Sequence, residues 1–380
     1  MLPSVAACGL TALLCGDKSP FVATNAYFAL VSQTIIILGT ISPGSCFFYT
    51  QKENVMSNMK ISVFSDPVCT WCWGSVPVWR ALAYHYGERL ELDYVMGGMI
   101  EDIRSYNNRR LSIGGDIALS NRKIHDHWLE ASAVHGMPVC EHGFRLFSQE
   151  RPSTIPQNLA YLAARVYEAR YSGEVKPGAA RRYLRHLQEA TALDAVLTND
   201  IDTLVDMSAV VGFSPEKFRT IYGSSVVKTL YDEGKAFCRN YEANSFPSYL
   251  VSYRGEEMLL RGYSTFDMVR NCIEQLSFGN IKPIDDGREK FTTENVLRFI
   301  DGYGSAYPVE IATAFGLARQ NGHTALNVES YEQLPDVLEE LLASEAVAAM
   351  PRGNGFLYYN LNGKHPKPHI FGHEYAGVVS

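Results

Sequence analysis

The sequence is poor in cysteine and has no excess of positive charge. Its 380 residues contain eight cysteines, which are too sparse for a fold held together by disulfide bonds. The 34 lysines and arginines stand against 41 acidic residues, and the formal net charge is -7. Because nucleic-acid-binding surfaces are usually basic, this composition does not predict nucleic acid as a partner. The length predicts two or three domains.

A long hydrophobic run is also missing. The most apolar stretch, residues 26–41, includes the polar residues Ser32, Gln33 and Thr34 and is shorter than the roughly 20 residues of a transmembrane helix. Asp17 and Lys18 precede it, whereas an export signal begins with a clearly basic segment. We therefore expect residues 1–58 to be an apolar extension outside the fold of a cytoplasmic protein. A membrane anchor or export segment is the alternative, and membrane contact would then be made through this extension.

What the sequence does contain is the motif Cys69-Thr70-Trp71-Cys72. Residues 60–64 predict a strand, and an Asp-Pro turn ends it because the residue before proline avoids helical geometry. Apolar residues then recur at helical spacing over residues 76–86. This pattern predicts a helix with Cys69 at its start and Cys72 in its first turn. The helix N-terminus favours a thiolate at Cys69, and Cys72 can close a disulfide with it.

A lone CxxC motif could also be half of a zinc site. Structural zinc needs four ligands, usually from a second CxxC motif or a histidine pair at finger-like spacing, and neither occurs. The nearest candidate ligands show no regular pairing, and they are His125, His127, His135, Cys140 and His142. We therefore favour redox chemistry and expect no metal.

The run Ser65-Asp66-Pro67-Val68-Cys69-Thr70-Trp71-Cys72-Trp73-Gly74, with Tyr86-Gly87 and Val95-Met96-Gly97-Gly98, resembles the DsbA-like thioredoxin proteins. The resemblance is closest to their FrnE-like branch of protein disulfide isomerases and covers roughly residues 59–278. It implies an α/β thioredoxin fold with an inserted helical domain, and a kink of the motif's helix at Pro77. Thr70-Trp71 replaces the Pro-His dipeptide of DsbA, so the redox potential is not predicted.

The remaining periodicity agrees with such a fold. Residues 90–96 alternate apolar and polar side chains and predict the second strand of a β-α-β unit. The expected helices of the insertion, which spans about residues 100–244, are 118–135, 157–171, 179–191, 201–211 and 215–239. A hairpin is expected at residues 249–253 and 256–260, followed by a helix at 265–276. These elements place the domain at residues 59–281, and Met56 or Met59 is an alternative start of the protein.

The resemblance also assigns the site. Cys69 is expected to be the nucleophile and the accessible thiol, and Cys72 the screened, resolving thiol. Pro247 matches the cis-proline beside the motif, and the backbone of Phe246 would offer an edge to an extended substrate. An ordinary proline at a strand start is the alternative. The predicted substrate-binding residues are Thr70, Trp71, Trp73, Phe246 and Pro247.

Residues 288–362 follow a polar linker and resemble a winged-helix domain. The expected elements are helices at 293–303, 308–316 and 334–347, then a turn at 352–355 and a strand at 356–361. The helix that would enter a DNA groove is acidic, with Glu332, Asp336, Glu339, Glu340 and Glu345 on it or beside it. Phosphates would repel these residues, so we expect this unit to bind protein rather than DNA.

Residues 363–380 form a tail. Within it, residues 369–379 resemble the Gly-His-Glu segment of zinc-dependent medium-chain alcohol dehydrogenases. Because nothing else of that fold is present, His373 and Glu374 have no ligand set. We attribute this likeness to chance or to a sequence junction.

The preferred hypothesis is a thiol-disulfide oxidoreductase or isomerase that acts on protein or small-molecule disulfides. No bound cofactor is implied, and glutathione or thioredoxin would be its electron partner. Two alternatives remain open: a non-catalytic DsbA-like adaptor that binds protein partners, and a kappa-type glutathione-dependent transferase or isomerase. The oligomeric state is not predicted.

Overall fold

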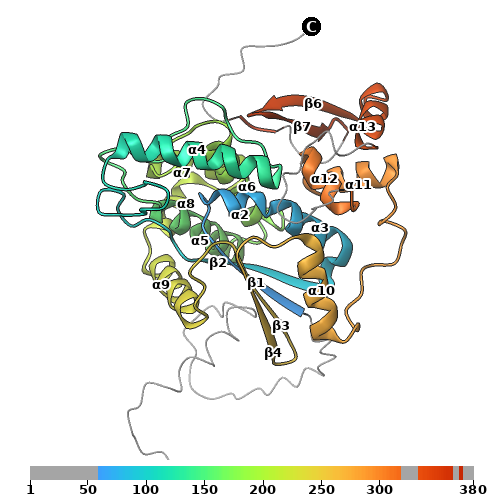
Figure 1. Cartoon of the computed structure of the whole chain (residues 1–380), viewed down its shortest axis with the longest axis horizontal. Helices are drawn as coiled ribbons and strands as arrows, with labels where there is room; N and C mark the ends of the chain where they lie inside the picture. The colour runs from blue at the N-terminus through green and yellow to red at the C-terminus, as the bar shows by residue number, and fades with distance from the viewer. Residues whose placement is uncertain (1–58, 318–332, 363–367, 371–380) are drawn as a thin grey trace, which may run out of the picture. The chain divides into compact units, whose positions relative to one another are not determined.

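The structure is a computed structural model, which describes residues 59–317, 333–362 and 368–370 (Figure 1). Its larger sheet has the strand order β2-β1-β3-β4. These strands are β1 (Met59–Ser65), β2 (Leu90–Met96), β3 (Ser248–Tyr253) and β4 (Glu256–Arg261). β1 runs parallel to β2 and antiparallel to β3, and β3 turns directly into β4. The predicted β-α-β unit and hairpin are therefore confirmed.

Helices cover both faces of this sheet. Ile61 of β1 belongs to a core formed with α3 (Val76–Tyr86) and α10 (Phe266–Ser277). Phe64 belongs to another cluster, formed with residues of α9 (Ser225–Asn240). Because successive residues of a strand point to opposite faces, the two clusters lie on opposite sides of the sheet. The predicted α/β architecture follows from this arrangement.

Between β2 and β3 the chain forms the predicted helical insertion (Figure 1). Its helices are α4 (Ile117–His135), α5 (Ile155–Arg170), α6 (Ala179–Ala192), α7 (Ile201–Val210), α8 (Pro215–Tyr222) and α9. The single helix expected at 215–239 is wrong, because the chain is extended at Ser224 between α8 and α9. The Ser224 hydroxyl donates to the carbonyl of Ile221 at 2.6 Å. Serine competes for backbone hydrogen bonds in this way and so favours helix ends.

The helix that follows the cysteine motif is divided into two. α2 (Thr70–Gly74) and α3 meet at Ser75. The short 3-10 turn η1 (Gly87–Arg89) follows the end of α3. The Ser75 hydroxyl donates to the Cys72 carbonyl at 2.8 Å and accepts from the Trp79 indole at 3.1 Å. Pro77 lies in the first turn of α3, where a missing N–H costs no helical hydrogen bond. The break therefore lies at Ser75, two residues before the expected kink.

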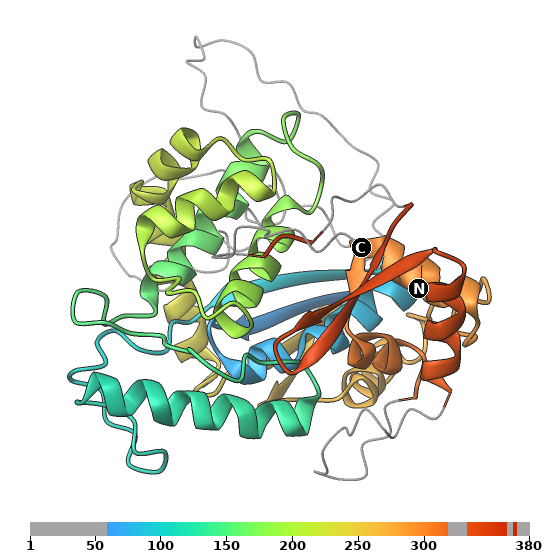
Figure 2. The same cartoon turned by 90° about the horizontal axis from the view of Figure 1, so that it is seen from above.

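The C-terminal part has its own sheet, with the strand order β5-β7-β6. Its strands are β5 (Ser305–Ala306), β6 (Val347–Arg352) and β7 (Gly355–Asn360). Its helices are α11 (Thr293–Tyr303), α12 (Pro308–Ala314) and α13 (Leu334–Ala343). Figure 2 shows the red hairpin of β6 and β7 beside the orange and red helices that it contacts. The winged-helix identification and the domain boundaries stay predictions.

The helix expected at 334–347 is too long. α13 ends at Ala343, and Glu345 has a positive φ of 53°, which takes the chain out of the helix. Strand β6 begins at Val347 and was missed, because its alanine and methionine residues also suit a helix. Glu332, one of the acidic residues assigned to this helix, lies outside the described residues.

A buried ion-pair network joins the C-terminal part to the rest. Glu310 of α12 accepts hydrogen bonds from Arg80 of α3 at 2.8 Å and from Arg185 of α6 at 2.9 and 3.2 Å. The same carboxylate accepts from the backbone N–H of Tyr307 at 2.8 Å, which caps α12. Arg80 and Glu310 are both buried. The network therefore links α3, which follows the cysteine motif, to the helical insertion and the C-terminal part.

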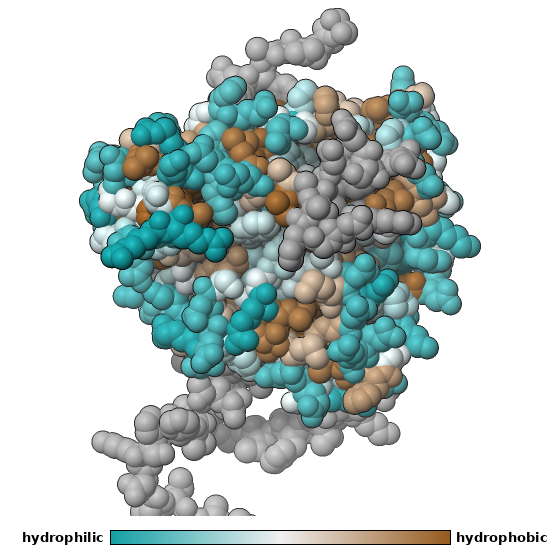
Figure 3. Space-filling view, viewed as in Figure 1, coloured by the Kyte–Doolittle hydropathy of each residue, from teal (hydrophilic) through white to brown (hydrophobic). Residues whose placement is uncertain are grey.

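Hydrophobic side chains gather in separate patches on the face seen in Figure 3, with hydrophilic side chains between them. The large apolar residues whose side chains are exposed belong to several different elements. They include Met99, Val226, Met268, Phe278 and Phe356. The exposed apolar surface is therefore distributed over the loop after β2, α9, α10 and the C-terminal hairpin.

Predictions for the two ends of the chain fall mostly on residues that are not described. Residues 1–58 and the tail residues His373 and Glu374 lie outside the described part. Within the described ranges, the structure contains no helix with the length and hydrophobicity needed to cross a membrane.

The substitution Glu310→Ala should lower the free energy of unfolding by about 3 to 5 kcal/mol, because it leaves the buried Arg80 without its carboxylate and removes one of the two carboxylates that pair with Arg185. Urea unfolding followed by circular dichroism measures this change. The matched control is Glu339→Ala on the exposed side of α13, which should change the same free energy by no more than about 0.5 kcal/mol. Equal changes in the free energy of unfolding for the two substitutions would show that Glu310 contributes no more stability than an exposed glutamate does.

Candidate functional site

The loop between β1 and α2 is held by the buried side chain of Asp66. Its Oδ1 accepts from the backbone N–H of Val68, and its Oδ2 accepts from the backbone N–H of Met99 and from the Asn158 amide, each at 2.9 Å. Its own carbonyl accepts from the backbone N–H of Cys69 at 3.2 Å. One carboxyl group therefore fixes the loop that carries the first cysteine, the loop after β2 and the start of α5.

Burial raises the pKa of Asp66 to about 6, and its hydrogen bonds with Asn158, Val68 and Met99 oppose this shift. A buried polar group needs hydrogen-bond partners, and the three N–H groups that donate to this carboxyl group compensate for its removal from water. The group therefore changes its charge near neutral pH, inside the fold and close to the cysteine motif.

Cys69 occupies the N-cap position of α2, as predicted, with an extended backbone. Its thiol donates to the carbonyl of Phe246 at 3.5 Å. The Phe246–Pro247 peptide bond is cis, which confirms that prediction. Gly97, at the end of β2, leaves the space that the Phe246 ring fills, because a Cβ at this position would collide with the ring. The predicted substrate edge and the predicted nucleophile therefore lie next to each other.

Cys72 lies behind Cys69, one turn into α2. Burial, together with the neighbouring Cys69 thiol, raises the pKa of Cys72 well above its ordinary value, while hydrogen bonding to Ser65 and Asp66 opposes the shift. Both cysteines are free thiols, and they are 5% and 3% exposed. The expected contrast between an accessible and a screened thiol is therefore small in exposed area. It is clearer in position, because Cys69 lines a cavity and Cys72 does not.

The cavity beside Cys69 has a volume of about 490 Å³. Predicted site residues contribute Cys69, Thr70, Trp71 and Phe246 to its walls. The other walls come mainly from the loop after β2, from α4 and from the end of α9, and they include Met99, Tyr106, Trp128, Lys235 and Arg239. A cavity of this size is typical of a small-molecule site, and its apolar walls with a few polar groups fit that description.

Two histidines of α4 support the dipeptide between the cysteines. The Trp71 ring lies 5.8 Å from the ring of His135 and 6.4 Å from that of His127, measured between centroids. His135 accepts at Nδ1 from the backbone N–H of Met137 at 3.1 Å, so its proton is on Nε2, which faces the Thr70 hydroxyl at 3.4 Å. Burial lowers the pKa of His135 to about 3 and lowers that of His127 as well. The His135 ring is therefore neutral at physiological pH.

Trp73 lies in the protein core rather than on the cavity wall. It is fully buried, and its indole N–H donates to the carbonyl of Pro138 at 2.9 Å. Its ring packs against Tyr307 of the C-terminal part, 6.0 Å away between centroids. These contacts are structural, and direct binding of a substrate by Trp73 or Pro247 stays a prediction.

Several residues of the site were not predicted. Asp66 and Gly97 were noticed only as parts of the family resemblance, although both contact the residues around Cys69. His135 was considered only as a metal ligand, yet its ring fills the space that a side chain at Gly74 would need. The feature of the sequence that could have indicated this contact is Gly74, directly after Trp73, because a glycine lets another side chain approach the backbone closely.

Cys238 of α9 also lines the cavity beside Cys69, and burial raises the pKa of its thiol to about 12. Among the suggested zinc ligands, His125 bonds the carbonyl of Cys140 at 2.8 Å through Nε2. Within the described residues, no group of three or more histidine, cysteine or acidic side chains is placed to hold a metal ion.

Comparison with known proteins places this geometry in a family. The family model described as Thioredoxin matches residues 63–271, which is more than half of the chain. This match confirms the predicted fold over that region, and the FrnE-like branch stays a prediction. The ClpXP adapter protein SpxH of Bacillus subtilis (strain 168) is 20% identical over 308 residues, which cover 80% of this chain and 90% of SpxH.

Two solved structures are similar at lower identity. The cytosolic disulfide reductase DsbM from Pseudomonas aeruginosa is 17% identical, covers 57% of this chain and 97% of its own, and has a TM-score of 0.44. A candidate protein disulfide isomerase from Nitrosomonas europaea is 16% identical, covers 59% of this chain and 99% of its own, and has a TM-score of 0.48.

The pKa of Asp66 predicts a pH dependence of stability. Its folded pKa of about 6 lies above the ordinary value of 3.8, so the group stabilises the fold at low pH, and this contribution is lost as pH rises through 6. Relative to Asp66→Asn, which does not titrate, the wild type should lose about 2 kcal/mol of unfolding free energy between about pH 4.5 and about pH 7.5. Urea unfolding of both proteins across this range measures the difference.

The exposed Asp285 provides the control. Because this side chain lies at the surface, the unfolding free energy of Asp285→Asn should stay within about 0.5 kcal/mol of that of the wild type in these measurements. A constant difference for Asp66→Asn as well would mean that the carboxyl group does not titrate as its burial requires.

Proposed function

From the premise that this chain belongs to the thioredoxin family, we propose that it is a thiol-disulfide oxidoreductase in which Cys69 attacks and Cys72 resolves. The observation that carries the proposal is the position of the two free thiols. Cys69 lies at the N-cap of α2 on the wall of a cavity, and Cys72 lies directly behind it. Protein or small-molecule disulfides are the proposed substrates.

The first step is the attack of the Cys69 thiolate on a substrate disulfide. A bond forms between Cys69 Sγ and one substrate sulfur, the substrate S–S bond breaks, and the second substrate sulfur leaves as a thiolate. The N-terminus of α2 favours the negative charge of the attacking thiolate. The hydrogen bond from the Cys69 thiol to Phe246 is made only by the protonated form, so it is given up when the thiol ionises.

In the second step Cys72 attacks Cys69 Sγ. This forms the Cys69–Cys72 disulfide and releases the remaining substrate sulfur as a thiolate, so the substrate gains two electrons and the protein loses two. The raised pKa of Cys72 keeps this thiol protonated in the resting protein, so Cys72 must lose its proton as it attacks, and the departing substrate thiolate takes up that proton. Glutathione or thioredoxin would return the two electrons to complete a reductase cycle, and cytoplasmic location is part of this proposal.

The walls of the cavity support a substrate that approaches along Phe246. Trp71 and Phe246 contribute apolar surface to the cavity that Cys69 lines, and Arg239 contributes a cationic group. Lys235 also lines the cavity, but it is paired with Glu101 at 2.5 Å. An anionic thiol compound such as glutathione suits this combination of apolar walls and a cationic group.

A second candidate function is a non-catalytic adaptor. The observation that favours it is the similarity to SpxH, a ClpXP adapter protein, which extends over 80% of this chain and so includes residues beyond the thioredoxin region. An adaptor would bind its partners without any change in the oxidation state of Cys69. The two candidates therefore differ in whether a covalent intermediate forms.

Substitution of Cys72 tests the proposed chemistry. In Cys72→Ser the attack still occurs but resolution does not, so mixed disulfides with substrate should accumulate and disappear on reduction. In Cys69→Ser no such adduct should form, and insulin reduction with glutathione should fall to the background rate in both variants. Non-reducing electrophoresis, intact-protein mass spectrometry and the insulin assay measure these outcomes.

Cys238→Ser is the matched control, because Cys238 lines the same cavity but burial raises the pKa of its thiol to about 12. It should trap no substrate and should retain near wild-type insulin reduction. A protein that binds partners equally well in wild type and both single variants, with no covalent adduct in Cys72→Ser, would be an adaptor. Glutathione-dependent turnover that persists in Cys72→Ser would instead indicate a kappa-type transferase or isomerase.

A further inference from the structure

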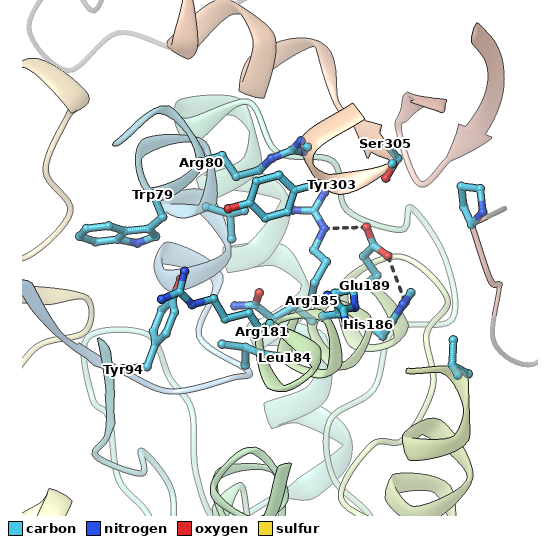
Figure 4. Close-up of a pocket in the computed structure, with 18 of the residues that line it drawn as sticks. Trp79, Arg80, Tyr94, Arg181, Leu184, Arg185, His186, Glu189, Tyr303 and Ser305 are labelled. Carbon is cyan, nitrogen blue, oxygen red and sulfur yellow. Dashed lines mark hydrogen bonds and ion pairs between the residues drawn. The ribbon is translucent and has the colours of Figure 1, made fainter. Parts of the chain in front are cut away.

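A second cavity lies apart from the cysteine motif. It has a volume of about 470 Å³, and none of its lining residues lines the cavity beside Cys69. Figure 4 shows its labelled walls, which come from α3, β2, α6 and the segment from α11 to β5. The thioredoxin sheet, the helical insertion and the C-terminal part therefore all contribute to it.

Cationic side chains dominate the polar groups of this cavity. Four arginines line it, and they are Arg80, Arg181, Arg182 and Arg185, whereas Glu189 is the acidic residue among the lining residues. The Glu189 carboxylate is already engaged, because it accepts from Arg185 at 2.8 Å and from the Tyr307 hydroxyl at 3.3 Å. The lining groups therefore carry an excess of positive charge.

Two of these arginines make no ion pair with an acidic side chain of the described chain. Arg181 donates to the carbonyl of Leu92 at 2.9 Å, and Arg182 donates to the carbonyls of Pro177 at 2.8 Å and Lys176 at 2.9 Å. These carbonyls orient the two guanidinium groups at the wall of the cavity. Arg181 is exposed and Arg182 is partly buried, so both can donate further hydrogen bonds to an anion in the cavity.

Arg80 gives an independent indication of a ligand. It is 3% exposed, and its Nη1 donates to Glu310, but its Nε and Nη2 have no hydrogen-bond partner within the described structure. Its guanidinium group lies over the ring of Tyr303, 4.2 Å from the centroid, and both residues line the cavity (Figure 4). Buried N–H groups are rarely left unpaired, because desolvation without a hydrogen bond is unfavourable.

The other walls are apolar. They include Trp79, Leu92, Tyr94, Leu184 and Val210. Figure 4 shows Trp79 and Tyr94 together at one end of the labelled residues, with Glu189 and His186 toward the other. A ligand that fills this space therefore needs an apolar body as well as an anionic group.

We propose that this second cavity binds a small organic anion, with its carboxylate or phosphate group among Arg80, Arg181, Arg182 and Arg185 and its apolar body against Trp79 and Tyr94. The volume of the cavity lies within the usual range for small-molecule sites. The ligand connects α3, α6 and the C-terminal part, so its binding stabilises the folded protein as a whole. This inference does not depend on the proposed oxidoreductase activity.

Isothermal titration calorimetry on the full chain tests the proposal with three probes that share a two-ring apolar body. 2-Naphthoate and 2-naphthyl phosphate carry the anionic group, and 2-naphthamide is neutral. Both anions should bind with one site per chain, and the amide should bind at least about tenfold more weakly, since charge-assisted hydrogen bonds are lost. The tighter of the two anions identifies whether the natural ligand is a carboxylate or a phosphate ester.

Variants locate the site. Arg181→Gln and Arg182→Gln change side chains outside the buried network, and each should weaken naphthoate binding about tenfold while leaving the thermal midpoint without ligand almost unchanged. Arg109→Gln, an exposed arginine that lines neither cavity, should bind as the wild type does. Arg80→Gln should abolish binding, and its circular dichroism spectrum checks that it is folded.

Prior alkylation of the wild type with iodoacetamide separates the two cavities. Naphthoate should still bind after Cys69 has been modified, because the cavities share no lining residue. Equal binding of the amide and the anions would overturn the proposal. So would full retention of binding in Arg181→Gln and Arg182→Gln, or loss of binding on alkylation, which would place the probe beside Cys69.

Discussion

The arrangement of the thioredoxin sheet, the helical insertion and the C-terminal part depends on the hydrogen bonds and ion pairs of the buried Glu310 carboxylate. This carboxylate bonds Arg80 of α3, Arg185 of α6 and the backbone at the start of its own helix α12. A buried ion pair contributes little net stability but is costly to break, so such a network specifies which surfaces meet more than it strengthens them. Here the network positions α3, which directly follows the short helix α2 that carries Cys72. It also positions the helical insertion and the C-terminal part relative to α3. The second cavity has the same origin, since Arg80 and Arg185 also line it.

Asp66 has the corresponding role at the cysteine motif. Its carboxyl group joins the end of β1, the loop after β2 and α5, which are separated in the sequence but meet around Cys69. Its raised pKa reflects what burial of a charge costs even when three N–H groups bond it. Gly97 and Gly74 allow Phe246 and His135 to approach the motif closely. The position of the Cys69 thiol therefore depends on contacts made by residues that have no reactive group of their own.

The predicted site was correct where chemistry and local geometry coincide in a short segment. The Asp-Pro turn and the helical spacing after it placed Cys69 at the N-cap and Cys72 one turn later, and the resemblance identified Pro247 as cis. The positions of Cys238 and His127 at the cavity, and of His135 beside Trp71, could not be predicted in this way. Their proximity to Cys69 and Trp71 arises from the packing of α4 against α2 and of α9 against β2, and no local pattern records which helix faces approach each other.

The sequence by itself determined the strands of the larger sheet, most helices and the cysteine motif, because hydrophobic periodicity, proline and capping residues act over a few residues. It misjudged the break at Ser224 and the strand β6. At the first the Ser224 hydroxyl bonds the carbonyl of Ile221, and before the second Glu345 adopts a left-handed conformation. Only the tertiary structure decided how the helical insertion and the C-terminal part pack, and so that Nε and Nη2 of the buried Arg80 are left without acceptors within the described residues. The physical reason is that a guanidinium group is recognised as unpaired only when burial has removed water and the neighbouring elements have supplied too few acceptors.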